Sequence, residues 1–259
     1  MTNERVAVIT GGAQGIGRRT AELLAEQGYR IAIIDQQEPI ATVAAIESAG
    51  DTVFAFAGDI TLDSTVTAFA ESVLSSYGRA DVLVNNAGIS HIEPAERTSS
   101  RDYRRVIEVN LVAPFLLAQA FGKHMLAAGR GSIVNVASVA GLLGIADRSA
   151  YNTSKAGLIG LTRTLAAEWG GRGVRVNAVC PGWVKTEMDA VDQARGTYTD
   201  ADITNRIPMG RFATADDIAH AIAFLADDTQ SPFINGHALS VDGGWATDGS
   251  WESLRLSKR

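Results

Sequence analysis

The chain has 259 residues, of which 46% are hydrophobic and 20% are charged, and its formal net charge is −6. A chain of this length and composition can bury a core large enough to fold without disulfides or metal ions. Its acidic balance and its lack of Lys/Arg clusters argue against a nucleic-acid partner.

Cysteine and histidine usage restricts the chemistry further. Cys180 is the single cysteine, and the four histidines stand far apart, so neither type shows the spacing of a metal site. The amino terminus has no secretion-signal pattern, and we find no apolar stretch of the ~18–20 residues that would span a bilayer. We therefore expect a cytoplasmic protein without a metal or a membrane partner.

Short segments rich in β-branched residues alternate with segments of helical periodicity along the whole chain. The expected strands are Val6–Thr10, Arg30–Asp35, Thr52–Ala57, Asp81–Asn85, Ser132–Ala137, Val174–Val179 and His237–Val241. The expected helices are Gly15–Gln27, Pro39–Ala49, Asp63–Tyr77, Arg101–Ala128, Ala150–Gly170 and Ala215–Ala226. Left-handed glycine caps are expected at Gly28, Gly50, Gly78, Gly129 and Gly171.

This alternation predicts an α/β fold, because parallel strands need crossovers and the helices supply them. We expect one domain over residues 1–259, a doubly wound parallel sheet of about seven strands with helices on both faces. Two stretches fall outside the pattern. Residues 183–213 are irregular and suit a substrate lid, and residues 246–259 form a polar tail that is either disordered or covers a neighbouring subunit's pocket.

The first expected strand leads through Thr10-Gly-Gly-Ala-Gln-Gly-Ile-Gly17 into a helix. Glycines at 11, 15 and 17 allow a tight turn, and the helix start, with Gln14 and Ile16 beside it, offers N–H groups and a positive dipole end to a pyrophosphate. The spacing differs from the general dinucleotide pattern Gly-x-Gly-x-x-Gly. Tight strand–helix packing is the alternative explanation.

Asp35 ends the second strand, 18 residues after Gly17. A carboxylate there is placed to accept hydrogen bonds from the adenosine ribose and to repel a 2′-phosphate. The neighbours Gln36 and Gln37 are uncharged, which favours NAD(H) over NADP(H). A solvated strand end is the alternative.

Tyr151 and Lys155 are one helical turn apart and therefore share a helix face. A nearby ammonium lowers the pKa of a phenol, so we expect Tyr151 to act as general acid and base. A Tyr-x3-Lys pair often arises by chance, so it indicates a catalytic site only when other motifs accompany it.

That context is a series of motifs that resembles the short-chain dehydrogenase/reductase family over residues 5–245. The motifs, in family order, are Thr10-Gly-x3-Gly-x-Gly17, Asp59, Asn85-Asn-Ala-Gly88, Asn110, Ser138, Tyr151-x3-Lys155 and Pro181-Gly182. The resemblance implies a Rossmann fold and a hydride transfer between a nicotinamide and a secondary alcohol or ketone. It also implies a homotetramer, or a dimer, in which the two long helices and the last strand form the interfaces.

The resemblance also implies residue roles. Ser138 would hold the substrate oxygen, Lys155 the nicotinamide ribose, and Asn110 a proton-relay water at a backbone irregularity in its helix. The remaining residues implied in cofactor binding are Asp59, Ile60, Asn86, Ala87, Gly88, Pro181, Gly182, Val184 and Thr186.

Family position places the substrate pocket at His91, Leu142, Leu143, Trp183 and the segment 187–210. Trp183 suits either stacking on a sugar-like face or packing within the lid. The acids of the segment, Glu187, Asp189, Asp192, Asp200 and Asp202 against Arg195 and Arg206, either disfavour phosphorylated and CoA-linked substrates or are simply solvated. Sequence similarity favours a polyol, sugar or other small alcohol dehydrogenase, with a 3-oxoacyl-carrier-protein reductase as the alternative and a non-catalytic NAD-binding protein as a remote one.

Overall fold

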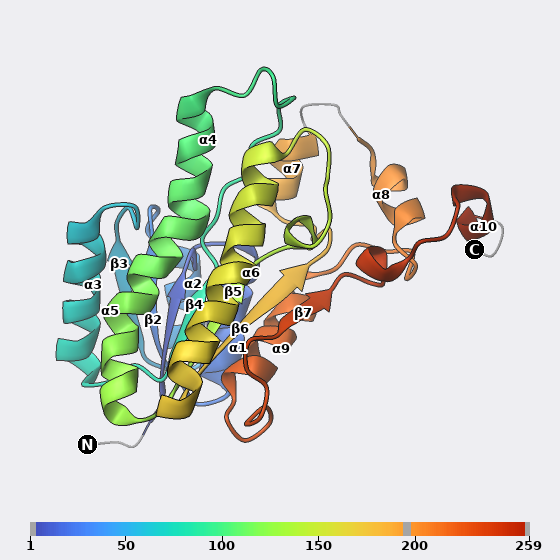
Figure 1. The fold of residues 1–259 in the computed structure, drawn as a ribbon. Helices are drawn as coiled ribbons and strands as arrows, with labels where there is room; N and C mark the ends of the chain where they lie inside the picture. Colours follow the sequence, from blue (N-terminus) through green and yellow to red (C-terminus); the bar gives the residue numbers. More distant parts are fainter. Residues whose placement is uncertain (1–3, 194–197, 257–259) are drawn as a thin grey trace.

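The computed structural model of the protein describes residues 4–193 and 198–256. Seven parallel strands form one sheet in the order β3-β2-β1-β4-β5-β6-β7, which confirms the predicted doubly wound fold (Figure 1). The strands are β1 Val6–Thr10, β2 Arg30–Asp35, β3 Val53–Ala57, β4 Val82–Asn85, β5 Gly131–Val136, β6 Val174–Pro181 and β7 Ala238–Val241. The order reverses between β1 and β4, and such switch points open a crevice at the carboxyl ends of the strands.

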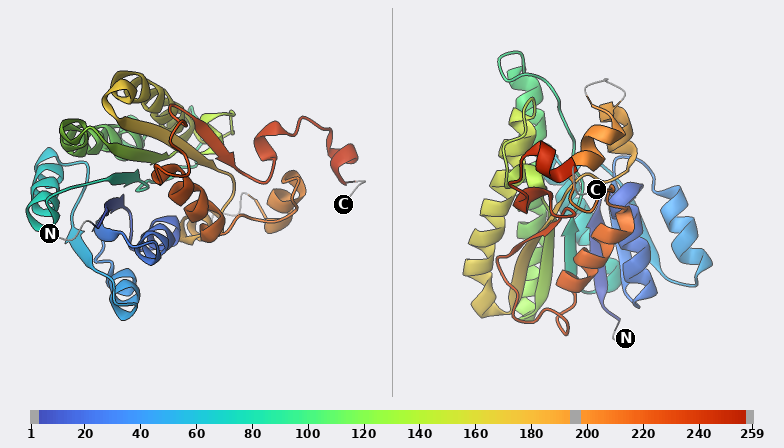
Figure 2. Two further views of the ribbon diagram at one scale, coloured as in Figure 1. Left: turned by 90° about the horizontal axis from the view of Figure 1, so that it is seen from below. Right: turned by 90° about the vertical axis from the view of Figure 1, so that its right-hand side faces the viewer.

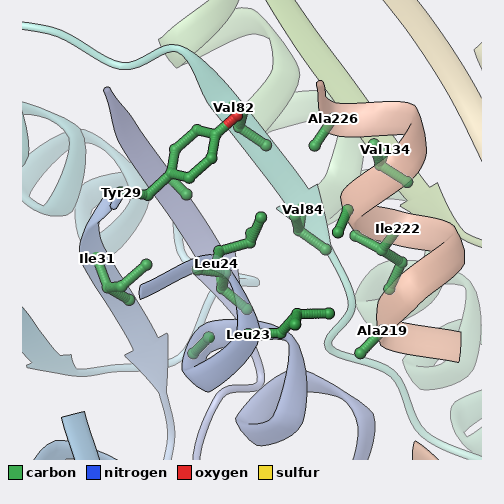
Figure 3. Packing of buried hydrophobic residues seen from close by; sticks show 14 of the residues in the cluster. Leu23, Leu24, Tyr29, Ile31, Val82, Val84, Val134, Ala219, Ile222 and Ala226 are labelled. Carbon is green, nitrogen blue, oxygen red and sulfur yellow. The ribbon is translucent and has the colours of Figure 1, made fainter. Parts of the chain in front are cut away.

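Successive strand residues face opposite layers of helices, because side chains alternate along a strand. In β1, Ala7 and Ile9 pack under α1 (Gly15–Glu26) and α9 (Ala215–Ala226). Figure 3 shows Leu23, Leu24 and Ile222 meeting in this layer. Val6 and Val8 belong to the opposite core, which α3 (Asp63–Tyr77), α5 (Ala113–Ala128) and α6 (Ser149–Trp169) cover (Figure 2).

The expected helix Arg101–Ala128 is divided into three parts. α4 (Ser100–Ile107) and α5 are joined by a π-helical turn, Glu108–Val112, and Asn110 lies in that turn. The predicted backbone irregularity at Asn110 is therefore confirmed. By length and mean hydropathy, 1.3, the whole segment could cross a membrane, which the sequence was expected to lack. Leu117, Phe121 and Met125 of α5 are nevertheless fully buried against the sheet, as in a core helix.

Three expectations about local structure need correction. The segment 183–213 was expected to be irregular, but it contains α7 (Glu187–Gln193) and α8 (Asp200–Arg206). The left-handed glycine after α6 is Gly173, with φ of 84°, rather than Gly171, because a 3₁₀ turn at Gly170–Arg172 extends the helix end. Helix α2 is shorter than expected and spans Ile40–Ser48.

The carboxyl-terminal segment folds back on its own lid. Arg206 of α8 donates hydrogen bonds to the carbonyls of Trp245 and Asp248, and its guanidinium pairs with the Asp248 carboxylate at 3.3 Å. The short helix α10 (Glu252–Leu256) lies beside α8, away from the sheet (Figure 1). The described part of this segment is therefore ordered against the chain's own lid, whereas the expected contact with a neighbouring subunit stays a prediction.

Candidate active site

A cleft of about 410 Å³ opens at the carboxyl ends of the strands, where the strand order reverses. Its walls combine the glycine turn after β1, the ends of β2 to β6, the start of α6 and helix α7. The predicted residues that line it are Gly11, Gln14, Gly15, Ile16, Asp35, Asp59, Ile60, Asn86, Ala87, Gly88, Ser138, Tyr151, Lys155, Pro181, Gly182, Trp183, Val184 and Thr186. Predicted residues between 11 and 88 and between 138 and 186 are thus brought together at the carboxyl ends of the strands.

The glycine turn is shaped for close backbone approach. Gly11 and Gly15 adopt positive φ angles of 69° and 55°, which favour glycine. Gly17 lies behind the cleft, and a Cβ there would come within 2.0 Å of the Gly11 carbonyl oxygen. Helix α1 begins without a side-chain cap and without an acidic residue in its first turn, so its N–H groups and dipole remain available to an anion.

Two carboxylates lie at the end of the cleft that the sequence predicts to bind adenosine. Asp35 is held by hydrogen bonds from the backbone N–H groups of Ala13 and Gln37, both at 3.0 Å. Asp59 accepts hydrogen bonds from Thr61 and pairs with Arg105 at 3.2 Å. Burial opposes ionisation of Asp59, but the hydrogen bonds from Thr61 and the Arg105 guanidinium lower its pKa below the usual range.

Asn86 fastens the glycine turn to β4. Its side-chain amide donates to the carbonyls of Thr10 and Gly11 at 2.9 and 3.0 Å. The Thr10 hydroxyl in turn accepts from the backbone N–H groups of Asn86 and Ala87. The loop predicted to close over the adenosine side is therefore rigidly joined to the phosphate turn.

Asn110 lies behind the cleft wall, where it holds the next loop in place. Its amide exchanges hydrogen bonds with the backbone N–H and carbonyl of Ile89, both at 2.9 Å, and donates to Ser154 at 3.1 Å. A Cβ added to Gly88 would stand 3.3 Å from the Asn110 Oδ1 and 3.5 Å from the Lys155 Nζ. The π-turn thus brings the Asn110 amide and the Lys155 ammonium to the same point.

Tyr151 and Lys155 both face the cleft from α6, as their spacing predicted. The Lys155 ammonium is 5.6 Å from the centroid of the Tyr151 ring and donates a hydrogen bond to the Val136 carbonyl at 2.7 Å. Ser138 starts the 3₁₀ turn Val139–Gly141, and its hydroxyl accepts a hydrogen bond from the backbone N–H of Ala140 at 3.1 Å. The three side chains converge where β5 ends.

The pKa values at this point differ from the simple expectation. Burial raises the pKa of Tyr151, and the groups that oppose this rise are the Ser138 hydroxyl and the Arg148 guanidinium. Lys155 was expected to supply that effect, but its own pKa is lowered to about 8 because its ammonium is buried. At neutral pH the lysine remains a cation beside the phenol.

The lid contributes an aromatic wall and a buried ion pair. The Trp183 indole is stacked on Trp245, with centroids 4.6 Å apart, and meets Tyr198 edge-on. Trp183 therefore packs within the lid and also lines the cleft. Arg148, which sequence reasoning missed, directly precedes α6 without capping it and pairs with Asp192 of α7 at 3.1 Å.

Some expected substrate residues lie elsewhere. His91, Leu142 and Leu143 are outside the set of described residues that line the cleft. Asp189 and Asp192 are both buried, at 6% exposure, so the acidic run is only partly solvated. Arg195 falls outside the described residues. Arg148 carried no motif signal in the sequence.

Comparison with known proteins identifies the family. The family model described as enoyl-(acyl carrier protein) reductase matches residues 11–246, and the chain belongs to the short-chain dehydrogenase/reductase family. D-threitol dehydrogenase of Mycolicibacterium smegmatis is 44% identical over 93% of this chain and 92% of its own. Cis-4-hydroxycyclohexanecarboxylate dehydrogenase of Sinomonas cyclohexanicum is 42% identical, covering 93% and 96%.

The solved structure of a putative NAD(P)-dependent gluconate 5-dehydrogenase from Beutenbergia cavernae, with bound NADP, is 41% identical with a TM-score of 0.88, covering 94% of this chain and 97% of its own. A 3-oxoacyl-[acyl-carrier-protein] reductase of Bos taurus is 38% identical, covering 93% and 98%. The protein is thus an oxidoreductase that acts on CH–OH groups with a nicotinamide cofactor.

Proposed function

We propose that the protein is an NAD(H)-dependent dehydrogenase that interconverts a secondary alcohol and a ketone, with a polyol or sugar as substrate. The observation that carries the proposal is the convergence of Ser138, Tyr151 and Lys155 at one end of a cleft whose other end is marked by Asp35. The identity to a relative named for D-threitol supports the substrate class.

The residues of the cleft fit a nicotinamide dinucleotide. The uncapped start of α1 suits the pyrophosphate, and Asp35 suits the adenosine ribose. Val184 and Thr186, at the end of the chain segment after β6, suit the nicotinamide carboxamide. When bound, the cofactor supplies the acceptor or donor of the hydride.

The chain's own residues then handle the proton and the oxygen. Ser138 donates a hydrogen bond to the substrate oxygen and orients it. Tyr151 takes the hydroxyl proton during oxidation and returns it during reduction, and the Lys155 ammonium stabilises the phenolate. Asn110 fixes the loop at Ile89 and so supports the wall beside Lys155.

Asp35 supports NAD(H) over NADP(H). Its carboxylate is fixed by two backbone donors, and a 2′-phosphate placed there would face a negative charge. Arg18, in the first turn of α1, is engaged by Glu22 at 2.8 Å. Because the related gluconate 5-dehydrogenase structure holds NADP, the coenzyme preference of this protein has to be measured directly.

A coenzyme and substrate panel tests the proposal. The purified protein is assayed with NAD⁺ and NADP⁺ on tetritols, pentitols and hexitols, and with NADH and NADPH on a β-ketoacyl thioester. We expect oxidation of polyols with a kcat/KM higher for NAD⁺ than for NADP⁺. Reduction of the thioester with NADPH alone would instead support the alternative reductase function.

Tyr151→Phe is the matched control for catalysis. The protein fluorescence of this variant should still be quenched when NADH binds, while its turnover falls by about 10²–10⁴-fold. Unchanged turnover would contradict the proton-transfer role, and absence of nucleotide binding by the wild type would contradict the whole assignment.

We also propose that the protein works in the cytoplasm as a homotetramer or dimer through α5, α6 and β7. Phe115 on α5 and Phe233 just before β7 support this, because both aromatic rings are exposed on a single chain. Light scattering coupled to size exclusion measures the mass directly, and a monomer at working concentration would contradict the proposal.

A further inference from the structure

A charged pair is buried in the substrate wall of the cleft. The Arg148 Nη1 lies 3.1 Å from the Asp192 Oδ2, and both residues are at least nine-tenths buried. The Ser90 hydroxyl lies 3.0 Å from the same guanidinium nitrogen and 3.1 Å from the same carboxylate oxygen. Arg148 and Asp192 line the cleft together with Tyr151.

The pair joins the catalytic helix to the lid. Arg148 immediately precedes α6, three positions before Tyr151, whereas Asp192 belongs to α7. The guanidinium also lies 5.6 Å from the centroid of the Trp183 ring. A buried ion pair is often no more stabilising than apolar residues of the same volume, so stability alone does not explain these charges.

The chemistry of the pair suits a neutral polyhydroxylated ligand. Guanidinium N–H groups donate and a carboxylate accepts, and each hydroxyl group of a vicinal diol can do both. A carboxylate or phosphate on the substrate would meet a guanidinium whose charge Asp192 already neutralises. Asp189, a second buried acid of the same wall, is likewise paired, with Lys185 at 3.2 Å.

We propose that Arg148 and Asp192, with Ser90, form the specificity site for the hydroxyl group next to the reacting carbinol and select neutral vicinal polyols over hydroxy acids. The inference rests on the proposed dehydrogenase function and names its substrate class.

The test removes one charge of the pair. Asp192→Asn leaves the guanidinium uncompensated, so it should weaken polyol recognition and admit an anion. We measure kcat/KM with NAD⁺ for D-threitol and for D-threonate, in which a carboxylate replaces one terminal CH₂OH. The ratio of the two values should fall by roughly 10-fold or more, since hydrogen bonds to charged groups are among the strongest.

The matched control is Asp200→Asn. Asp200 is an exposed acid of the same lid, paired with Lys185 and outside the set of residues that line the cleft. Asp200→Asn removes the same charge as Asp192→Asn, and its ratio of kcat/KM for threitol to kcat/KM for threonate should stay within about 2-fold of the wild type. A similar fall in this control would overturn the inference, because the effect would then come from net charge.

A double variant replaces Asp192→Asn in this test if the single variant does not fold. Arg148→Gln/Asp192→Asn carries no charge at the site, so it should lose threitol activity by roughly 10-fold without gaining threonate activity. An unchanged ratio in the folded variants, with a wild type that oxidises threitol, overturns the inference and leaves the proposed function standing. A wild type that oxidises no polyol overturns both.

Discussion

Lys155 offers a prediction in which stability and activity move in opposite directions. The side chain is 4% exposed, and burial lowers its pKa from 10.5 to about 8. Keeping that ammonium charged at neutral pH costs the folded state about 3 kcal/mol, since one pKa unit is worth about 1.4 kcal/mol. Lys155→Met removes the charge but leaves the Val136 carbonyl without its donor, which costs about 1–2 kcal/mol. We expect a net gain of about 1–2 kcal/mol at pH 7.

The difference in stability between the wild type and Lys155→Met depends on pH. The folded-state pKa lies below the unfolded-state value, so between about pH 8 and pH 10.5 the unfolded chain binds more protons. Wild-type stability therefore rises relative to the variant across that window, by at most about 1.4 kcal/mol per pH unit. The advantage of Lys155→Met should be largest at pH 7 and shrink as the pH increases.

Urea unfolding of the cofactor-free protein at pH 7, 8, 9 and 9.5 measures this gap. Lys185→Met is the control, because Lys185 is 43% exposed and its pKa is raised by Asp200 and Asp189, so its loss should stabilise the protein at no pH. Lys155→Met should also lose dehydrogenase turnover. A variant destabilised at pH 7, with a gap that does not change with pH, would refute the reasoning.

Three further outcomes follow from the geometry of the cleft. Gly17→Ala places a Cβ 2.0 Å from the Gly11 carbonyl oxygen, so it should lower the unfolding midpoint and abolish NADH fluorescence enhancement, whereas an ordinary affinity would show that the turn can relax. Ser138→Ala removes the main group that opposes the raised pKa of Tyr151, so the rising limb of the kcat/KM profile for oxidation should move to higher pH, and a shift to lower pH would contradict this. Asn110→Leu removes the side-chain hydrogen bonds from the π-turn to Ile89 and Ser154. It should reduce turnover, measured by stopped flow, by about 10-fold or more, with little change in the NADH affinity measured by equilibrium titration.

The sequence predicted the sheet well because its signals are local and repeated. Apolar β-branched runs separated by helical periodicity define each βα unit, and the glycine turn, Tyr151 and Lys155 follow at fixed places in those units. A backbone irregularity at Asn110 was also predicted, since asparagine suits a helix interruption better than a helix interior, and the structure shows that it is a π-helical turn. The failures lie where the chain leaves the repeating units.

Helix α8 shows one such failure that a local signal could have prevented. Its capping box joins the Thr199 and Asp202 side chains to each other's backbone N–H groups, a pattern that is visible in the sequence. Arg148 and Asp192 could not have been found in this way. Their contact joins residues 44 positions apart, and nothing in either local segment indicates that both are buried. A charge run in a sequence does not distinguish a solvated face from a cleft wall.

Three residues of the cleft lie close together in the sequence at the start of α6. Tyr151 and Lys155 are four positions apart on α6 and therefore share one side of the helix, and Arg148 directly precedes the helix with non-helical backbone angles. The four positions from Tyr151 to Lys155 span about 6 Å of helix axis. The position of the Arg148–Asp192 pair relative to the Tyr151 phenol therefore depends on how the chain enters α6. Asp192 of α7 pairs with Arg148 at 3.1 Å, so the lid helix is fixed to the residue that directly precedes the helix carrying Tyr151.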